Sequence, residues 1–116
     1  MLSSIANAQT IDYVVPVYDA SIPPIMVEIA RCESGGTHFK PNGEVIRGVV
    51  NPDDIGKYQI NLYWHGETAK SMGLDLFKVE DNEEYALYLY KTQGVKPWNA
   101  SRPCWQGEKS IDTHLR

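Results

Sequence analysis

The segment from Ser21 to Gly36 carries an apolar repeat at helical spacing, and this repeat restricts what the chain can fold into. Its members share one face of a helix: Ile22, Ile25, Met26, Ile29 and Ala30. Ser21 is expected to cap the helix, with Pro23 and Pro24 in its first turn, where amide hydrogens have no helical partner. Gly35 and Gly36 would end it. The pattern therefore predicts an amphipathic helix that needs a core to pack against.

A short β-rich stretch follows. The β-branched residues between positions 45 and 50 predict a strand, and residues 55–60 predict a second one. Between them lies Asn51-Pro52-Asp53-Asp54, which is rich in turn formers. Together these features predict a small hairpin-like lobe.

Two further helices complete the expected order. Residues 62–71 predict a short helix, and a longer one is expected to begin at the capping-box-like pair Asp81 and Glu84 and to close at Gly94. Helix, small sheet and helices make an α+β domain, mostly α, with a minor β lobe.

The length of 116 residues fits one domain. We expect an N-terminal arm over residues 1–20, a folded domain over 21–105 and a polar tail over 106–116. Ala6-Asn7-Ala8 is typical of a signal-peptidase site, so the arm is interpreted as a signal-peptide remnant, with an ordinary N-terminal arm as the alternative.

Composition and spacing exclude several function classes. The net charge of −4 argues against nucleic acid as a partner, although it leaves anionic polymers open. No apolar run is long enough to span a membrane. His38, His65 and His114 lack metal-ligand spacing, so neither a metal nor a cofactor is expected.

Glu33 falls where the apolar face of the first helix would continue. Met26 and Ile29 lead to position 33 on that face, so a carboxyl group stands where an apolar residue is expected. Desolvation would raise its pKa, and a carboxyl that stays protonated near neutral pH is what a glycosidase uses as its general acid. The alternative is a helix-end glutamate that points into solvent.

The second candidate segment runs from Asp54 to Asn61. Gly56 would permit a close backbone approach, and alternation would place the amides of Gln59 and Asn61 on one face of a strand. Such amides suit sugar hydroxyl and acetamide groups. A hairpin with polar residues facing solvent is the alternative.

Three segments, in this order, resemble known enzymes. Cys32-Glu33-Ser34-Gly35-Gly36 resembles the catalytic-helix end of resuscitation-promoting factors and lytic transglycosylases. Asp54-x-Gly-x-x-Gln-Ile-Asn resembles the sheet segment of animal c-type lysozymes and of the exported transglycosylases of conjugation systems. Tyr90 to Gly94, Pro97-Trp98 and Cys104-Trp105 are similar to the C-terminal part of resuscitation-promoting factors. The resemblance covers residues 22–105.

The resemblance implies a lysozyme-like fold, in which a small β-hairpin lobe faces a helical lobe across a cleft. It implies cleavage of the β-1,4 bond between N-acetylmuramic acid and N-acetylglucosamine in peptidoglycan glycan strands, by a monomer. Glu33 matches the general acid, and Ser34 matches a residue that often hydrogen-bonds that acid. The other matching cleft residues are Tyr58, Gln59, Asn61, Tyr90 (with Tyr88 as the alternative) and Trp98, for which a core position is the alternative.

Asp54 divides the group. In c-type lysozymes the matching Asp is the second carboxylate, whereas most lytic transglycosylases work with one Glu and release an anhydro sugar. The turn formers before Asp54 favour a capping role for its side chain, and we slightly favour the transglycosylase.

The resemblance also implies a Cys32–Cys104 disulfide, since the family pairs a Cys beside the catalytic Glu with one near the C-terminus. The two cysteines alone leave free thiols open. A disulfide agrees with a secreted, periplasmic or cell-wall location. The alternative function is a catalytically silent peptidoglycan-binding or assembly module of the same fold.

Overall fold

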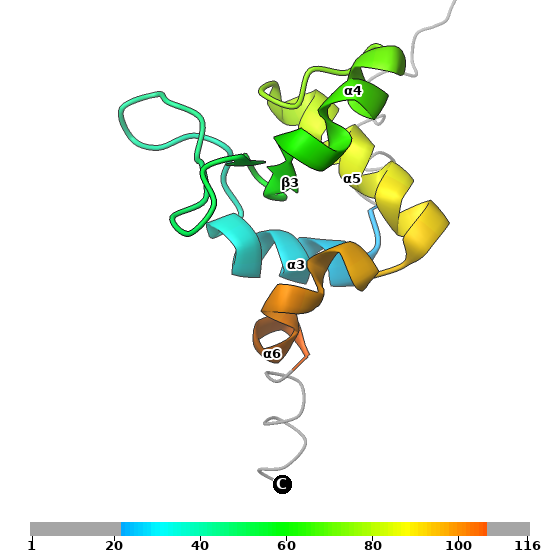
Figure 1. Cartoon of the computed structure of the whole chain (residues 1–116). Helices are drawn as coiled ribbons and strands as arrows, with labels where there is room; N and C mark the ends of the chain where they lie inside the picture. Colours follow the sequence, from blue (N-terminus) through cyan, green and yellow to red (C-terminus); the bar gives the residue numbers. More distant parts are fainter. Residues whose placement is uncertain (1–21, 107–116) are drawn as a thin grey trace, which may run out of the picture.

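The computed structural model describes residues 22–106, which form an α+β unit that is mostly helical, as expected. The elements are α3 (Pro24–Ser34), β2 (Asp54–Ile55), β3 (Ile60–Asn61), α4 (Leu62–Ser71), α5 (Val79–Gln93), the 3₁₀ helix η1 (Lys96–Ser101) and α6 (Arg102–Trp105). Figure 1 shows α3 on one side of the β hairpin and α4 on the other, with η1 and α6 beside α3. The expected arm over residues 1–20 and nearly all of the expected tail lie outside the described residues.

The helices follow the predicted pattern with shifted starts. Pro23 occupies the N-cap position of α3, and Ser21 lies outside the described residues. The short helix α4 has the expected bounds, because the Asn61 side chain caps it by accepting a hydrogen bond from the Trp64 amide at 3.0 Å. Helix α5 begins at Val79 and not at Asp81, whose carboxylate instead accepts a hydrogen bond from the Asp75 amide at 2.8 Å.

The prediction of one strand over residues 45–50 and a second over residues 55–60 is wrong. Residues 45–50 form no strand; Val45 and Arg47 make isolated bridges to Phe39 and Ile55. The side chains of Val49 and Val50 are 98% and 97% exposed, so their β-branched shape has nothing to pack against.

The chain instead folds back inside the second predicted strand. Asp54 pairs with Asn61 and Ile55 with Ile60 in an antiparallel hairpin. Gly56 and Gln59 adopt φ values of 73° and 50° in the turn, and the backbone N–H of Gln59 donates to the Gly56 carbonyl at 3.0 Å. The expected alternation along one strand is therefore replaced by a tight turn.

Two buried polar side chains hold this turn. Asn82 of α5 accepts a hydrogen bond from the Tyr58 amide at 3.0 Å and donates to the carbonyls of Ile55 at 2.9 Å and Leu76 at 3.0 Å. The Nδ1 atom of His38 accepts from the Lys57 amide at 3.0 Å. All of these polar groups are paired, so burying them fixes the hairpin at low cost.

The hydrophobic core joins all of the helices to the hairpin. Its buried members are Met26, Ile29, Ala30, Ile55, Tyr58, Ile60, Ala69, Leu76, Tyr85, Ala86, Leu89, Trp98 and Trp105. Helix α3 contacts both η1 and α6, and α5 contacts η1, so the last third of the chain closes over the first helix. This packing buries the apolar face of α3 that leads to position 33.

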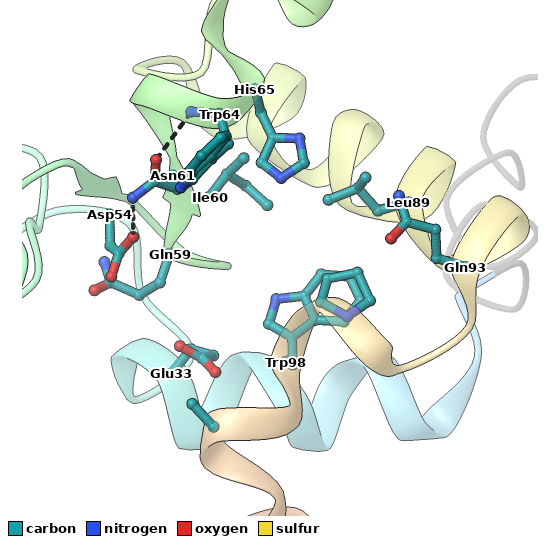
Figure 2. Close-up of a pocket in the computed structure, with 12 residues that line it drawn as sticks. Glu33, Asp54, Gln59, Ile60, Asn61, Trp64, His65, Leu89, Gln93 and Trp98 are labelled. Carbon is teal, nitrogen blue, oxygen red and sulfur yellow. Dashed lines mark hydrogen bonds between the residues drawn. The ribbon is translucent and has the colours of Figure 1, made fainter.

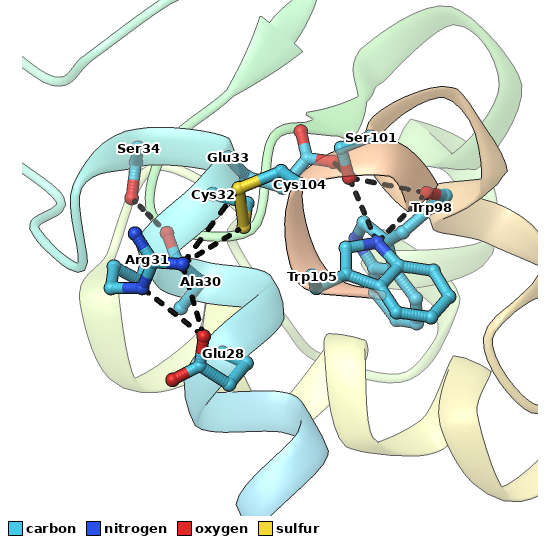
Figure 3. Close-up of a disulfide and its surroundings, with 10 residues drawn as sticks. All are labelled: Glu28, Ala30, Arg31, Cys32, Glu33, Ser34, Trp98, Ser101, Cys104 and Trp105. Atoms are coloured by element: carbon cyan, nitrogen blue, oxygen red, sulfur yellow. Dashed lines mark hydrogen bonds and ion pairs between the residues drawn. A yellow bond between two sulfur atoms is a disulfide. The ribbon is translucent and has the colours of Figure 1, made fainter. Parts of the chain in front are cut away.

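A disulfide joins Cys32 of α3 to Cys104 of α6, as the resemblance implied. Figure 3 shows the disulfide beside Glu33, near Ser101, Trp98 and Trp105. The Cα atoms are 6.0 Å apart, and the cysteines are separated by 72 positions. Closing a loop of that length stabilises the fold by about 4 kcal/mol in the chain-entropy model.

Gly56 gives the fold a direct test, because a Cβ atom there would overlap His38 and Asn82. We expect Gly56→Ala to lower the free energy of unfolding by roughly 2–4 kcal/mol, through left-handed backbone strain plus overpacking. Gly73→Ala is the matched control, since Gly73 has a φ of 79° with nothing within 4 Å of the added atom. Urea denaturation measures both, and equal losses would contradict the described clamp on the turn.

Candidate active site

A pocket of about 270 Å³ lies between the hairpin and the helices. Every described helix and strand except α6 contributes to the pocket wall. Figure 2 shows the side chains converging from these elements. The lining residues are Glu33, Asp54, Gln59, Ile60, Asn61, Trp64, His65, Leu89, Gln93, Pro97, Trp98 and Ala100. Five of the predicted site residues therefore meet in one place.

Glu33 lies at the end of α3 and is half-buried at the pocket wall. Burial raises the pKa of its carboxyl above the ordinary value of 4.5, and the nearby negative charge of Asp54 raises that pKa further. A hydrogen bond from Ser101 opposes both by lowering the pKa. Since desolvation is the largest of these effects, the proton is held to higher pH than on an exposed glutamate.

Ser101 fixes the orientation of the Glu33 carboxyl. Its hydroxyl donates to Oε2 of Glu33 at 2.6 Å, and it accepts from the Trp105 indole nitrogen at 3.1 Å. Among the described residues no group donates to Oε1, the other carboxyl oxygen of Glu33. The arrangement therefore anchors one carboxyl oxygen and leaves the second without a donor among these residues.

Asp54 faces the same pocket from strand β2. Its Oδ1 accepts a hydrogen bond from the side-chain nitrogen of Asn61 at 2.9 Å (Figure 2). The predicted turn-capping role for Asp54 is not what the structure shows, because the Asn51 side chain caps that turn by accepting from the Asp53 amide at 3.0 Å. A cap at Asn51 leaves the Asp54 carboxylate directed at the pocket.

Gln59 and Asn61 both line the pocket, although a turn and a helix cap place them there instead of one strand face. The Gln59 side chain donates to the Gly56 carbonyl at 3.1 Å, which fixes its amide. Trp98 combines the two predicted alternatives. It is 3% exposed, donates to the Tyr58 carbonyl at 3.0 Å and still presents part of its ring to the pocket.

Three other predicted site residues do not line the pocket. The Ser34 hydroxyl donates to the Lys57 carbonyl at 2.8 Å, so Ser101 takes the place beside Glu33 that was expected for Ser34. Tyr58 is buried against the edge of Trp98, with ring centroids 6.1 Å apart. Tyr90 packs on the core, and its alternative Tyr88 also lies outside the pocket.

Sequence reasoning missed several lining residues and the anchor. Trp64 and His65 lie in the first turn of α4, directly after the Asn61 cap, so the sequence could have predicted that they lie beside the hairpin. Gln93 lies on α5 one turn beyond Leu89. Ser101 carried no signal, because its role depends on how η1 folds over α3.

Comparison with protein-family models, with curated proteins and with solved structures finds no match for this chain. Within residues 22–106, no helix is both long enough and apolar enough to cross a membrane.

Ser101→Ala tests the electrostatics of the site. Removing the donor to Oε2 should raise the pKa of Glu33 further, because the hydroxyl favours the carboxylate form. An NMR titration of the Glu33 side-chain carboxyl carbon measures the pKa directly. Ser71→Ala is the control, since the exposed Ser71 hydroxyl donates to the Thr68 carbonyl of its own helix and Ser71 does not line the pocket. A Glu33 pKa that falls or stays constant in Ser101→Ala would contradict the assigned hydrogen bond.

Proposed function

We propose that this chain cleaves the β-1,4 bond between N-acetylmuramic acid and N-acetylglucosamine in peptidoglycan, with Glu33 as the general acid. The observation that carries the proposal is the half-buried Glu33 carboxyl, whose pKa is raised and which shares a pocket with a second carboxyl, Asp54. A carboxyl group that holds its proton to higher pH, placed beside a second carboxyl group, is the equipment of a glycosidase.

The chemistry follows from the two positions. Oε1 of Glu33 gives its proton to the glycosidic oxygen, and the C1–O bond breaks with positive charge developing on the sugar ring. In the hydrolytic form of the reaction, the Asp54 carboxylate, oriented by the Asn61 amide at 2.9 Å, would stabilise that charge. Ser101 then stabilises the ionised Glu33 through its 2.6 Å hydrogen bond, ready to accept a proton in the second step.

The rest of the pocket suits a glycan. The Gln59 and Asn61 side chains supply amide groups beside the acid, and sugar hydroxyl and acetamide groups pair with such groups. The indole of Trp64 is 73% exposed at the pocket wall, so a sugar ring can stack on its face. Polar groups beside flat aromatic surfaces favour a carbohydrate over a purely apolar ligand.

We propose the lytic transglycosylase as the first form of this activity, on the resemblance of the Glu33-Ser34-Gly35-Gly36 helix end and of residues 98–105. There the sugar's own C6 hydroxyl attacks C1 and gives its proton to Glu33, which leaves a 1,6-anhydro end. A hydrolytic muramidase is the second candidate. It is favoured by the place of Asp54 in the pocket, where it can act as nucleophile or ion stabiliser while water is consumed.

The proposal includes a lysozyme-like fold and an extracytoplasmic location. The hairpin and α4 would form one wall of the substrate cleft, with α3 and η1 forming the other. The Cys32–Cys104 disulfide supports an oxidising compartment, where such bonds persist. A silent binding module is the weaker alternative, because it would gain nothing from desolvating Glu33.

Glu33→Gln tests the function itself. The amide is nearly isosteric but has no proton to give, so release of soluble muropeptides from purified sacculi should fall at least about 10²–10⁴-fold. Glu28→Gln is the control on the same helix, since Glu28 forms an exposed ion pair with Arg31 away from the pocket. Near wild-type turnover by Glu33→Gln would refute the acid. Wild-type protein that binds sacculi without releasing muropeptides would favour the silent module.

Asp54→Asn separates the two mechanisms. For the transglycosylase, much of the activity should persist and mass spectrometry should show 1,6-anhydro ends with no added water. For the hydrolase, activity should fall by orders of magnitude, and wild-type products made in ¹⁸O-water should carry one labelled reducing end. Asp53→Asn is the neighbouring control, because Asp53 does not line the pocket. Reducing ends together with an inactive Asp54→Asn would overturn our preference for the transglycosylase.

A further inference from the structure

His65 is a pocket residue that the proposed chemistry does not use. It lies on α4, is half-buried, and extends its ring toward Leu89 of α5. In the view of Figure 2, Glu33 lies at the bottom of the pocket and His65 at the top. A ligand bound across the pocket would reach His65 with a part that is not being cleaved.

One ring nitrogen of His65 is already engaged. Its Nδ1 lies 3.0 Å from the hydroxyl of Tyr85, and the two rings meet edge to face with centroids 5.5 Å apart. Tyr85 is 1% exposed, so its hydroxyl needs its partners within the protein. A hydrogen bond with the Thr68 side chain also lowers the pKa of Tyr85, against the larger effect of burial, which raises it.

The burial of Tyr85 assigns the His65 tautomer. The buried Tyr85 O–H needs an acceptor, and Nδ1 of His65 lies 3.0 Å from it, so we assign Tyr85 as the donor and Nδ1 as the acceptor. A neutral ring whose Nδ1 accepts must carry its hydrogen on Nε2. Burial lowers the pKa of His65 from its ordinary value of 6.5, which favours the neutral ring. Among the described residues no group bonds to Nε2, so this hydrogen is available to a ligand.

We infer that His65 is a substrate-positioning residue, whose Nε2–H donates a hydrogen bond to an oxygen of a glycan unit beside the one that is cleaved. The inference rests on the proposed function and extends it to a second contact point of the same pocket. Tyr85 acts through His65 and does not touch the glycan. Because the contact is made away from the reacting bond, it contributes to binding and not to the chemical step.

The test uses Glu33→Gln as the parent, so that bound glycan is not cleaved, and the soluble tetramer of N-acetylglucosamine as the probe. Calorimetry should show that His65→Phe weakens binding about three- to tenfold, the worth of one neutral hydrogen bond. His65→Gln, whose amide can donate from a similar position, should stay within about twofold of the parent. Lys70→Gln is the control on the same helix but outside the pocket. Unchanged binding by His65→Phe, or an equal loss in both His65 variants, overturns the inference.

The tautomer provides a second readout that needs no ligand and keeps the pocket wall intact. Two-bond ¹H–¹⁵N spectra at pH 7 should show His65 protonated on Nε2 alone, and Tyr85→Phe should shift the proton partly to Nδ1. A charged ring or an Nδ1–H ring in the parent overturns the inference. These failures are distinct from failure of the proposed function, which would appear as no muropeptide release and no tetramer binding by any form of the protein.

Discussion

The buried side chain of Asn82 is the interaction on which the site depends. It is 0% exposed, and its three hydrogen bonds fix the backbone at Tyr58, Ile55 and Leu76. A hairpin of two-residue strands has too few ladder bonds to be stable by itself. Helix α5 therefore supplies the missing partners, and the position of Asp54 and Asn61 at the pocket follows from that support. Removing the amide would leave buried backbone groups unpaired, which costs about 1–3 kcal/mol for each.

Opposing effects set the pKa of the Glu33 carboxyl. The apolar face of α3 draws residue 33 out of water, and the disulfide at the neighbouring Cys32 holds α6 over it. Burial and the charge of Asp54 favour the protonated carboxyl, whereas Ser101 favours the carboxylate. A general acid must be protonated before the bond breaks and stable as an anion afterwards. Opposed effects of this kind bring the two protonation states closer in energy than burial alone would.

The sequence predicts the parts of this structure that rest on local patterns. The bounds of α4, the end of α5 at Gly94 and the place of Glu33 follow from period and caps. The close approach at Gly56 was also predicted, and the structure confirms it. The β-branched run at residues 45–50 predicts a strand that does not form, because strand formation needs a pairing partner that local propensity does not reveal. Ser101 belongs to the site only through long-range packing, which no spacing rule encodes.

The most direct test of the central claim compares the pKa of the Glu33 carboxyl with the pH dependence of muropeptide release. An NMR titration gives the pKa of Glu33, and the pH profile of muropeptide release gives the pKa of the group that must be protonated. The account predicts that Glu33 titrates above its ordinary value of 4.5, and that release declines on the alkaline side with the same pKa. A Glu33 pKa at or below 4.5, or an alkaline decline set by a different group, would contradict it.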